Sequence, residues 1–247
     1  MSAQLHRIET TPDLVERVYR ALLDAISTGG LQPGQRITQE ELAERMAVSR
    51  QPVTQALRLL KKDGFVQDAP LLNGAPQRTR GLQVAPLDPR QIAQVYEVRS
   101  ALDQLAVRLA AAQRARIDPA VFRQGEAAAQ RADLKALIDA DMAFHTAVYR
   151  AAGNPFIEQS AQQHWQHIRR AMGQALQSDP LREPVWDEHR AIAQAIAAGD
   201  GERAAQLMSA HTGNAARTLA HQLTGPADGG DAPGTDQLRG RRRQQLP

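Results

Sequence analysis

The sequence predicts a mostly α-helical protein, in which an N-terminal winged helix-turn-helix is followed by a C-terminal all-α helical bundle. Three observations support this prediction. Residues 38–64 carry the pattern of two short helices joined by a tight turn, and two short strand patterns follow them. After Val84 the apolar residues recur only at helical spacing. We therefore expect a winged-helix domain over residues 8–85, a helical domain over 88–224 and a disordered tail over 225–247.

The two short helices are delimited by residues that favour helix ends. Thr38 is followed by Glu41 at the spacing of a capping box, in which both side chains satisfy free backbone N–H groups. Residues 46–48 should form the turn. Ser49 should cap the second helix, whose first turn tolerates Pro52 because no helical hydrogen bond is lost there. Its apolar residues repeat at helical spacing and should face inward: Val53, Ala56, Leu57 and Leu60.

The opposite face of the second helix is polar and basic. Four basic residues and no acidic residue lie between positions 50 and 62, although the whole chain has a net charge of only +3. Such a face is typical of a helix that reads double-stranded DNA through base edges and phosphates, and the alternative is an ordinary solvated face. The candidate DNA contacts in this motif are Thr38, Arg50, Gln51, Thr54, Gln55 and Arg58.

Further elements are expected on both sides of this motif. An amphipathic helix should precede it, from about Pro12 to Thr28. After it, Gly64 should end the second helix, and residues 65–67 and 82–84 should form the strands of a β-hairpin. Arginines near the tip of such a hairpin would reach a DNA groove as a wing, so the candidate contacts also include Arg78 and Arg80.

Helix start and stop signals divide the rest of the chain. Asp88 and Asp118 each precede a proline, which is the pattern of an N-cap followed by proline at the first helical position. Tyr96 and Arg99 are expected at the edge of the first of these helices. Four more helices are expected: 133–152, from 155 to before 178, from 184 to 199, and 201–223.

Three histidines and an aspartate in this region suggest a metal site. Asp141 and His145 lie four residues apart, so both leave the same face of one helix, and His189 and His211 come from two later helices. Three imidazoles and a carboxylate suit a divalent ion such as zinc, nickel, manganese or iron. The alternative is that each is a surface or packing histidine. Competing candidates are His164 and His167, whereas His6 and His221 look incidental.

The N-terminal motifs resemble those of a known family. The matching segments are Leu31 to Ile37, Glu41 to Ala43, Val48 to Val53, Ala56-Leu57 and Gly64 to Val66. Together they closely resemble GntR-type bacterial transcription regulators, and this resemblance implies Arg50 as a principal DNA contact. Thr54 and Gln55 stand where the family usually has Arg-Glu, and Glu40 stands where many members have a base-contacting arginine. The resemblance therefore implies DNA binding without implying the family's usual operator half-site.

The helical region resembles the FCD ligand-binding domain of the FadR branch of that family. The matching segments are Val95 to Arg99, Asp141 to His145, Ala152 to Asn154, Glu188 to Arg190, Ala197 to Asp200, and His211. The resemblance implies that Asp141, His145, His189 and His211 are metal ligands and that the protein forms a homodimer through this domain. Asp103 stands where the family often has a glutamate.

The predicted metal site suggests the chemistry of an effector. Four protein ligands on an octahedral ion leave two positions, which a carboxylate or 2-hydroxy carboxylate could occupy. Arg99 would pair with a second acidic group, and Asn154 would either contact the effector or cap its own helix. We therefore expect a small organic acid whose binding changes the affinity for a DNA operator.

Composition narrows the remaining classes. The chain has no cysteine and no apolar run near the roughly 20 residues of a membrane span. Charged residues interrupt its N-terminal segment, which therefore does not have the apolar stretch of a signal peptide. We expect a soluble cytoplasmic protein without a membrane partner. A metalloenzyme is the rival, but Glu188 adjoins His189 and is expected to face elsewhere, so no acid–base partner is predicted and we expect no enzyme. A regulator that responds to the metal alone is a further alternative.

Overall fold

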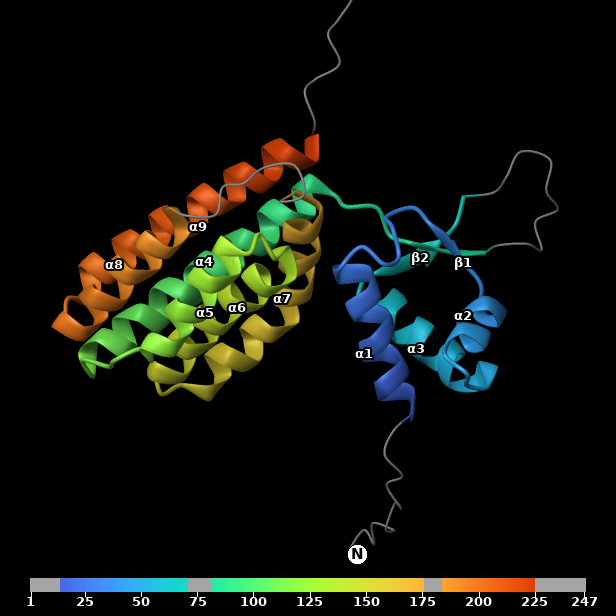
Figure 1. The fold of residues 1–247 in the computed structure, drawn as a ribbon, viewed down its shortest axis with the longest axis horizontal. Helices are drawn as coiled ribbons and strands as arrows, with labels where there is room; N and C mark the ends of the chain where they lie inside the picture. The colour runs from blue at the N-terminus through green and yellow to red at the C-terminus, as the bar shows by residue number, and fades with distance from the viewer. Residues whose placement is uncertain (1–13, 71–80, 176–183, 225–247) are drawn as a thin grey trace, which may run out of the picture.

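The computed structural model describes residues 14–70, 81–175 and 184–224, and its elements form two groups (Figure 1). The N-terminal group holds three helices and three strands, in the order α1 (Leu14–Ser27), β1 (Arg36–Ile37), α2 (Gln39–Arg45), α3 (Arg50–Lys62), β2 (Val66–Asp68) and β3 (Leu82–Val84). Four predictions lie outside the described residues: the hairpin tip with Arg78 and Arg80, the tail over 225–247, His6, and the first two residues of the expected Pro12–Thr28 helix.

The strands form an antiparallel sheet in the order β1-β3-β2. The predicted hairpin is confirmed, with Val66 opposite Val84 and Asp68 opposite Leu82. Strand β1 was missed by the sequence interpretation, which expects no strand between the Pro12–Thr28 helix and Thr38. Its two residues, Arg36 and Ile37, pair with Gln83 and Leu82, and so short a strand shows no periodicity in the sequence.

The helix-turn-helix forms at the expected residues. The backbone N–H of Glu41 donates to the Thr38 hydroxyl at 3.2 Å, so the predicted N-cap of α2 is confirmed. Ala47 turns the chain with φ 52°, and Gly64 ends α3 with φ 81°. Ser49 occupies the N-cap position of α3, but its side chain makes no capping hydrogen bond. The inward face of α3 packs against α1 in a core that contains Val53, Ala56, Leu57 and Leu60 with Val18, Leu22 and Ile26.

The C-terminal group is a bundle of six helices in the described residues: α4 (Pro89–Ala112), α5 (Pro119–Gln130), α6 (Leu134–Ala151), α7 (Pro155–Ala175), α8 (Pro184–Ala198) and α9 (Gly201–Thr224). Asp88, Asp118 and Asp133 each accept a hydrogen bond from a backbone N–H of the helix that follows, as the capping patterns predict. Helix α4 contacts α6, α7, α8 and α9, so it is the central helix of the bundle. No helix in these ranges is both long and apolar enough to cross a membrane.

The orientation of α4 differs from the sequence expectation. Tyr96 and Arg99 are not at the edge of the helix, because each is only 3% exposed and faces the interior. Val98 and Leu105 belong to the apolar residues that recur at helical spacing in this segment, yet they are 47% and 45% exposed. Hydrophobic periodicity failed here because the interior beside α4 contains a polar cluster, in which charged side chains find partners.

Helix α7 joins the two groups. His167 stacks on Phe65 with ring centroids 4.4 Å apart, and Arg169 Nη1 lies 2.8 Å from Asp24 Oδ1. Arg170 donates to the carbonyl oxygen of Ala85. At Gly173, a Cβ would come 2.7 Å from the Ser27 carbonyl oxygen, so α1 and α7 approach more closely than a larger residue at that position would allow.

A second glycine lies against Trp186, which packs beside the histidine cluster described below. A Cβ at Gly125 of α5 would overlap the indole ring of Trp186, which is buried and packs edge-on against His189 with centroids 4.9 Å apart. We expect Gly125→Ala to lower the free energy of unfolding by about 1–3 kcal/mol through overpacking. Chemical denaturation followed by circular dichroism measures this change.

The matched control is Gly213→Ala in α9. Among the described residues, its added Cβ would meet only the Arg217 guanidinium at 3.5 Å, which is ordinary contact with a movable side chain. The free energy of unfolding should therefore stay unchanged or rise by up to about 1 kcal/mol, since alanine is the better helix former. Equal effects of the two substitutions would contradict the packing role of Gly125.

Candidate metal centre and nucleic-acid interface

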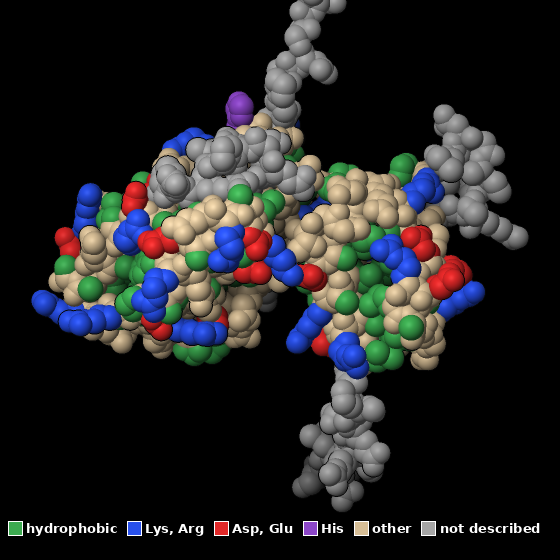
Figure 2. Space-filling model, viewed as in Figure 1, with side chains coloured by type: hydrophobic (Ala, Val, Ile, Leu, Met, Phe, Trp, Pro, Cys, Tyr) green, Lys and Arg blue, Asp and Glu red, His purple; other side chains and the backbone are tan. Residues whose placement is uncertain are grey.

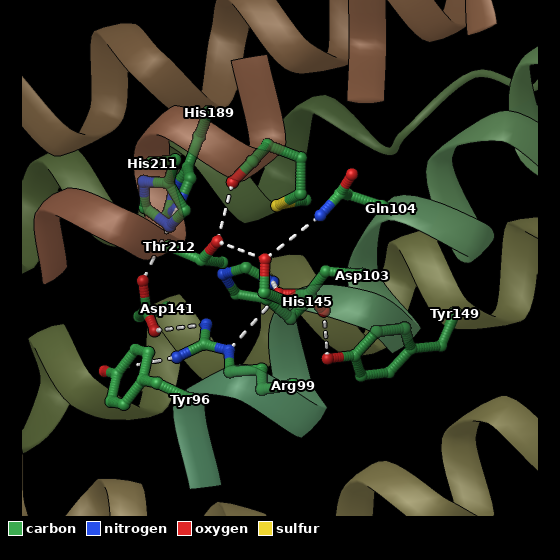
Figure 3. Close-up of polar contacts among 12 residues, drawn as sticks. Tyr96, Arg99, Asp103, Gln104, Asp141, His145, Tyr149, His189, His211 and Thr212 are labelled. Carbon is green, nitrogen blue, oxygen red and sulfur yellow. Dashed lines mark hydrogen bonds and ion pairs between the residues drawn. The ribbon is translucent and has the colours of Figure 1, made fainter. Parts of the chain in front are cut away.

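The four predicted metal ligands converge in the middle of the helical bundle. Asp141 and His145 come from α6, His189 from α8 and His211 from α9, and one donor atom of each lies within 4.8 Å of the others (Figure 3). His189 Nε2 is 3.3 Å from His211 Nε2 and 3.4 Å from Asp141 Oδ1. All four residues are buried. Among the described residues, no other group of histidine, aspartate and glutamate meets this spacing.

The spacing of these atoms fits a shared divalent ion. Ligand atoms about 2.1 Å from one ion lie about 3.0 Å apart in octahedral and about 3.4 Å apart in tetrahedral coordination. The observed 3.3 and 3.4 Å fall in that interval. His145 Nε2 is buried without a hydrogen-bond partner, although an orphaned polar atom is costly in such a place. A cation would satisfy it.

Burial also favours the ligand form of the histidines. It lowers the pKa of His189 well below the usual value, and the neighbouring His211, His145 and Arg99 add to this effect. It likewise lowers the pKa of His145, as does the charge of Arg99. Imidazole binds metals in the neutral form, so these nitrogens are available without the loss of a proton near neutral pH.

A surrounding set of side chains orients the ligands. Asp103 Oδ2 lies 3.5 Å from His145 Nδ1 and 3.3 Å from Arg99 Nε, and Tyr149 donates its hydroxyl to the other oxygen. Although burial acts to raise the pKa of Asp103, His145 and Arg99 hold it at about 2. The Trp165 ring covers Arg99, with Cζ 4.3 Å from the ring centroid. Because Asp103 lies beside Nδ1 of His145, Nε2 is the nitrogen that would face a bound ion.

The sequence interpretation missed the role of this surrounding set. Asp103 was noted only as standing where a glutamate is frequent, and Tyr149 was not considered. The spacing in the sequence could have indicated it, because Arg99 and Asp103 are four residues apart on α4, and His145 and Tyr149 are four residues apart on α6. Each pair therefore leaves one helix face together.

The expectation that Glu188 faces away from the histidine cluster is wrong. The Oε2 atom of Glu188 lies 2.7 Å from His211 Nδ1. Adjacent residues on a helix point about 100° apart. His189 can therefore enter the cluster while Glu188 reaches sideways to α9, where it fixes the ring of His211.

A cavity of about 270 Å³ adjoins the cluster. Asp141, His211 and Arg99 form its polar end, and Met172, Val185 and Leu219 supply apolar wall. Asn154 does not line this cavity and instead accepts a hydrogen bond from the Phe156 N–H at the start of α7, which is the capping alternative. His164 and His167 are not part of the described cluster.

The second candidate site is the outer face of α3. Arg50, Gln51, Gln55 and Arg58 are exposed there, as a helix that enters a DNA groove requires. Arg50 Nη1 lies 3.0 Å from Glu40 Oε1. Thr54 is half-buried, because its hydroxyl contacts Gln39 Oε1 at 2.9 Å and the Arg50 carbonyl. Thr54 therefore joins α2 to α3 instead of projecting freely.

Charged side chains of both signs share one face of the molecule. On the face shown in Figure 2, Lys and Arg side chains lie among Asp and Glu side chains over both groups of elements. The described α3 differs, since it carries four basic residues and no acidic one. Its local charge, not the net charge of the chain, is what suits a phosphate backbone.

Comparison with known families agrees with this architecture. Residues 14–70 match the family described as bacterial regulatory proteins, gntR family, and residues 94–214 match the FCD domain. A helix-turn-helix followed by this helical domain defines a DNA-binding transcriptional regulator. The chain belongs to the gntR family and is one of its members with an FCD domain.

Individual relatives support the assignment. The chain is 31% identical over 149 residues to an uncharacterized helix-turn-helix transcriptional regulator of Agrobacterium vitis, which covers 56% of this chain and 80% of that protein. It is 29% identical over 199 residues to an uncharacterized helix-turn-helix transcriptional regulator from an unstable DNA locus of Streptomyces ambofaciens. This match covers 78% of this chain and 80% of that protein. The solved structure of Escherichia coli McbR matches with a TM-score of 0.69 at 21% identity, over 85% of this chain and 98% of that one, and so shares the fold.

Proposed function

We propose that this regulator binds a DNA operator as a homodimer and that a divalent metal with a small carboxylate effector in its FCD domain modulates that binding. The observation that carries the proposal is the buried Asp141, His145, His189 and His211 cluster beside a cavity, in the same chain as the helix-turn-helix. The donor set suits zinc, nickel or manganese better than the all-oxygen preference of calcium or magnesium. The protein would act in the cytoplasm, where bacterial DNA lies.

The cavity supports a carboxylate as effector. A bound ion would supply a positive centre at its polar end, and Arg99 lies at the same end. Arg99 Nη2 is 3.9 Å from Asp141 Oδ2, a long contact that leaves hydrogen-bonding capacity toward the cavity. A carboxylate would therefore meet both the ion and a guanidinium, and the apolar wall would receive the rest of a small acid.

Helix α7 offers a route between the effector and the DNA-binding domain. Trp165 and Met172 of this helix contact the site, while His167, Arg169 and Arg170 of the same helix contact the winged-helix domain. A shift of α7 on effector binding would therefore change the position of that domain. By linkage, DNA would change effector affinity by the same factor.

Two surfaces favour a homodimer: an exposed apolar stripe on α4 and the DNA-reading face of α3. Val98 and Leu105 are seven residues apart on α4, so these two exposed side chains form one apolar stripe that a second copy would cover. Two α3 helices in one dimer would read two half-sites.

The experiment is an operator-binding titration with the upstream region of the gene as probe. The affinity for the DNA probe should depend on divalent metal, and it should change further when a small carboxylic acid is added to the metal-loaded protein. A shift produced by metal alone, with no acid effect, would favour the metal-responsive alternative. Turnover of an acid without DNA would favour the metalloenzyme. Failure to retain the DNA in every state would overturn the proposal.

A further inference from the structure

We propose that Glu188 makes the cavity selective for monocarboxylates, so that acids with a second carboxylate are rejected. This inference rests on the proposed carboxylate effector and specifies its class. The feature behind it is an acidic side chain on the wall of a cavity that is proposed to receive an anion.

Glu188 is held in place from two sides. Its Oε2 lies 2.7 Å from His211 Nδ1, and Asn214 Nδ2 donates to its Oε1 at 3.4 Å. The exposed Arg217 donates to Asn214 Oδ1 at 2.5 Å, which leaves the amide nitrogen of Asn214 facing Glu188. Both oxygens of Glu188 therefore act as acceptors, the arrangement that suits the ionised carboxylate.

With a divalent ion bound, the charges around the cavity would balance. Among the described lining residues, only Arg99, Asp141 and Glu188 are charged at neutral pH with neutral histidine, and Asp103 lies directly behind Arg99. A divalent ion and Arg99 would together offset these three carboxylates. One effector carboxylate is attracted by the ion it binds, whereas a second would add uncompensated negative charge.

No described cation in the cavity remains for a second acid group once Arg99 has met the carboxylate that binds the ion. Arg99 contacts Asp103 at 3.3 Å and Asp141 at 3.9 Å, and it lies at the metal end. Beyond that end the lining is Met172, Val185, Ala215 and Leu219 with the neutral polar Asn214 and Thr218. Arg217 is exposed and does not line the cavity, so solvent screens its charge. A second carboxylate would thus approach Glu188 across a partly apolar space, where repulsion is stronger than in water.

The test compares acids of equal length on the metal-loaded full chain by isothermal titration calorimetry. The probes are butanoate against butanedioate, and 2-hydroxybutanoate against 2-hydroxybutanedioate. We expect the wild type to bind each monocarboxylate at least about 10-fold more tightly than its dicarboxylate partner. In Glu188→Gln, the neutral amide can still accept from His211, and the difference should shrink below about 3-fold.

Asp187→Asn is the matched control. It removes the same charge from the neighbouring residue of α8, whose side chain is 76% exposed, pairs with Arg190 and does not line the cavity. The preference of this variant should equal that of the wild type. Asn214→Asp is the second variant, because it adds a negative charge beside Glu188 and leaves the bond to His211 intact. In this variant, the ratio of monocarboxylate to dicarboxylate affinity should rise at least about 3-fold above that of the wild type.

The outcomes separate this inference from the proposed function. Metal content is measured by elemental analysis for every variant. If Glu188→Gln loses the ion, the affinity ratio of Asn214→Asp becomes the test of the inference. Acids that bind with no preference for monocarboxylates, or a preference that survives in metal-loaded Glu188→Gln, overturn the role of Glu188 alone. If no acid binds to any metal-loaded form, the carboxylate effector itself fails, and this inference fails with it.

Discussion

His211→Ala should abolish stable retention of a divalent ion and lower metal affinity by more than about 100-fold. This estimate exceeds the 10- to 100-fold effect of losing a residue that merely supports a ligand, because His211 would donate directly. Its Nε2 lies 3.3 Å from that of His189, and its ring forms part of the cavity wall. Truncation therefore enlarges an existing cavity and leaves no closed void in the core. The measurement is elemental analysis after dialysis, followed by competition with a chelator.

The control for this prediction is His164→Ala. His164 is a half-buried histidine of the same bundle that lies outside the cluster, so metal content should not change. Circular dichroism checks that both variants keep their helices. A wild-type level of bound ion in His211→Ala would show that the ligand set is misassigned.

Arg50→Ala should weaken operator binding by about 5- to 150-fold, which corresponds to about 1–3 kcal/mol for the loss of one good arginine contact. Arg50 lies at the N-terminus of α3, and its side chain is 68% exposed. In the free protein it pairs with Glu40 at 3.0 Å, and this exposed pair contributes little, so the guanidinium is available to DNA. Electrophoretic mobility shift or fluorescence anisotropy at fixed ionic strength measures the change.

Arg116→Ala is the charge-matched control for Arg50→Ala. Arg116 is an exposed arginine between α4 and α5, far along the chain from the helix-turn-helix, so operator affinity should stay within about 2-fold of the wild type. Glu40→Ala should act in the opposite direction and strengthen binding, since it removes a negative charge beside Arg50. Equal losses in Arg50→Ala and Arg116→Ala would mean that α3 is not the reading helix.

Local chemistry made much of the fold predictable. The cap at Thr38 and those at Asp88, Asp118 and Asp133 satisfy backbone groups within the next three residues, so the sequence alone contains both partners. The same holds for Gly64, whose left-handed conformation ends α3. The grouping of Asp141 with His145 was also local, because both leave the same face of α6.

Non-local contacts set the limit of prediction. Glu188 meets His211 only because α8 packs beside α9, and no spacing in the sequence encodes that meeting. Arg99 looked like an edge residue because charged side chains usually seek water, yet Asp103 and Asp141 from two helices partner it in the interior. Strand β1 exists because β3 is next to it, since two residues have no pattern of their own.

The junction at α7 has an evolutionary consequence. Two of its contacts are made to main-chain atoms, because Arg170 donates to the carbonyl oxygen of Ala85 and Gly173 lies against the carbonyl oxygen of Ser27. Main-chain atoms persist whatever side chain a codon specifies. Neither contact involves the outer surface of α3, so the amino acids there can diverge toward new promoters while these two attachments to the helical domain are kept.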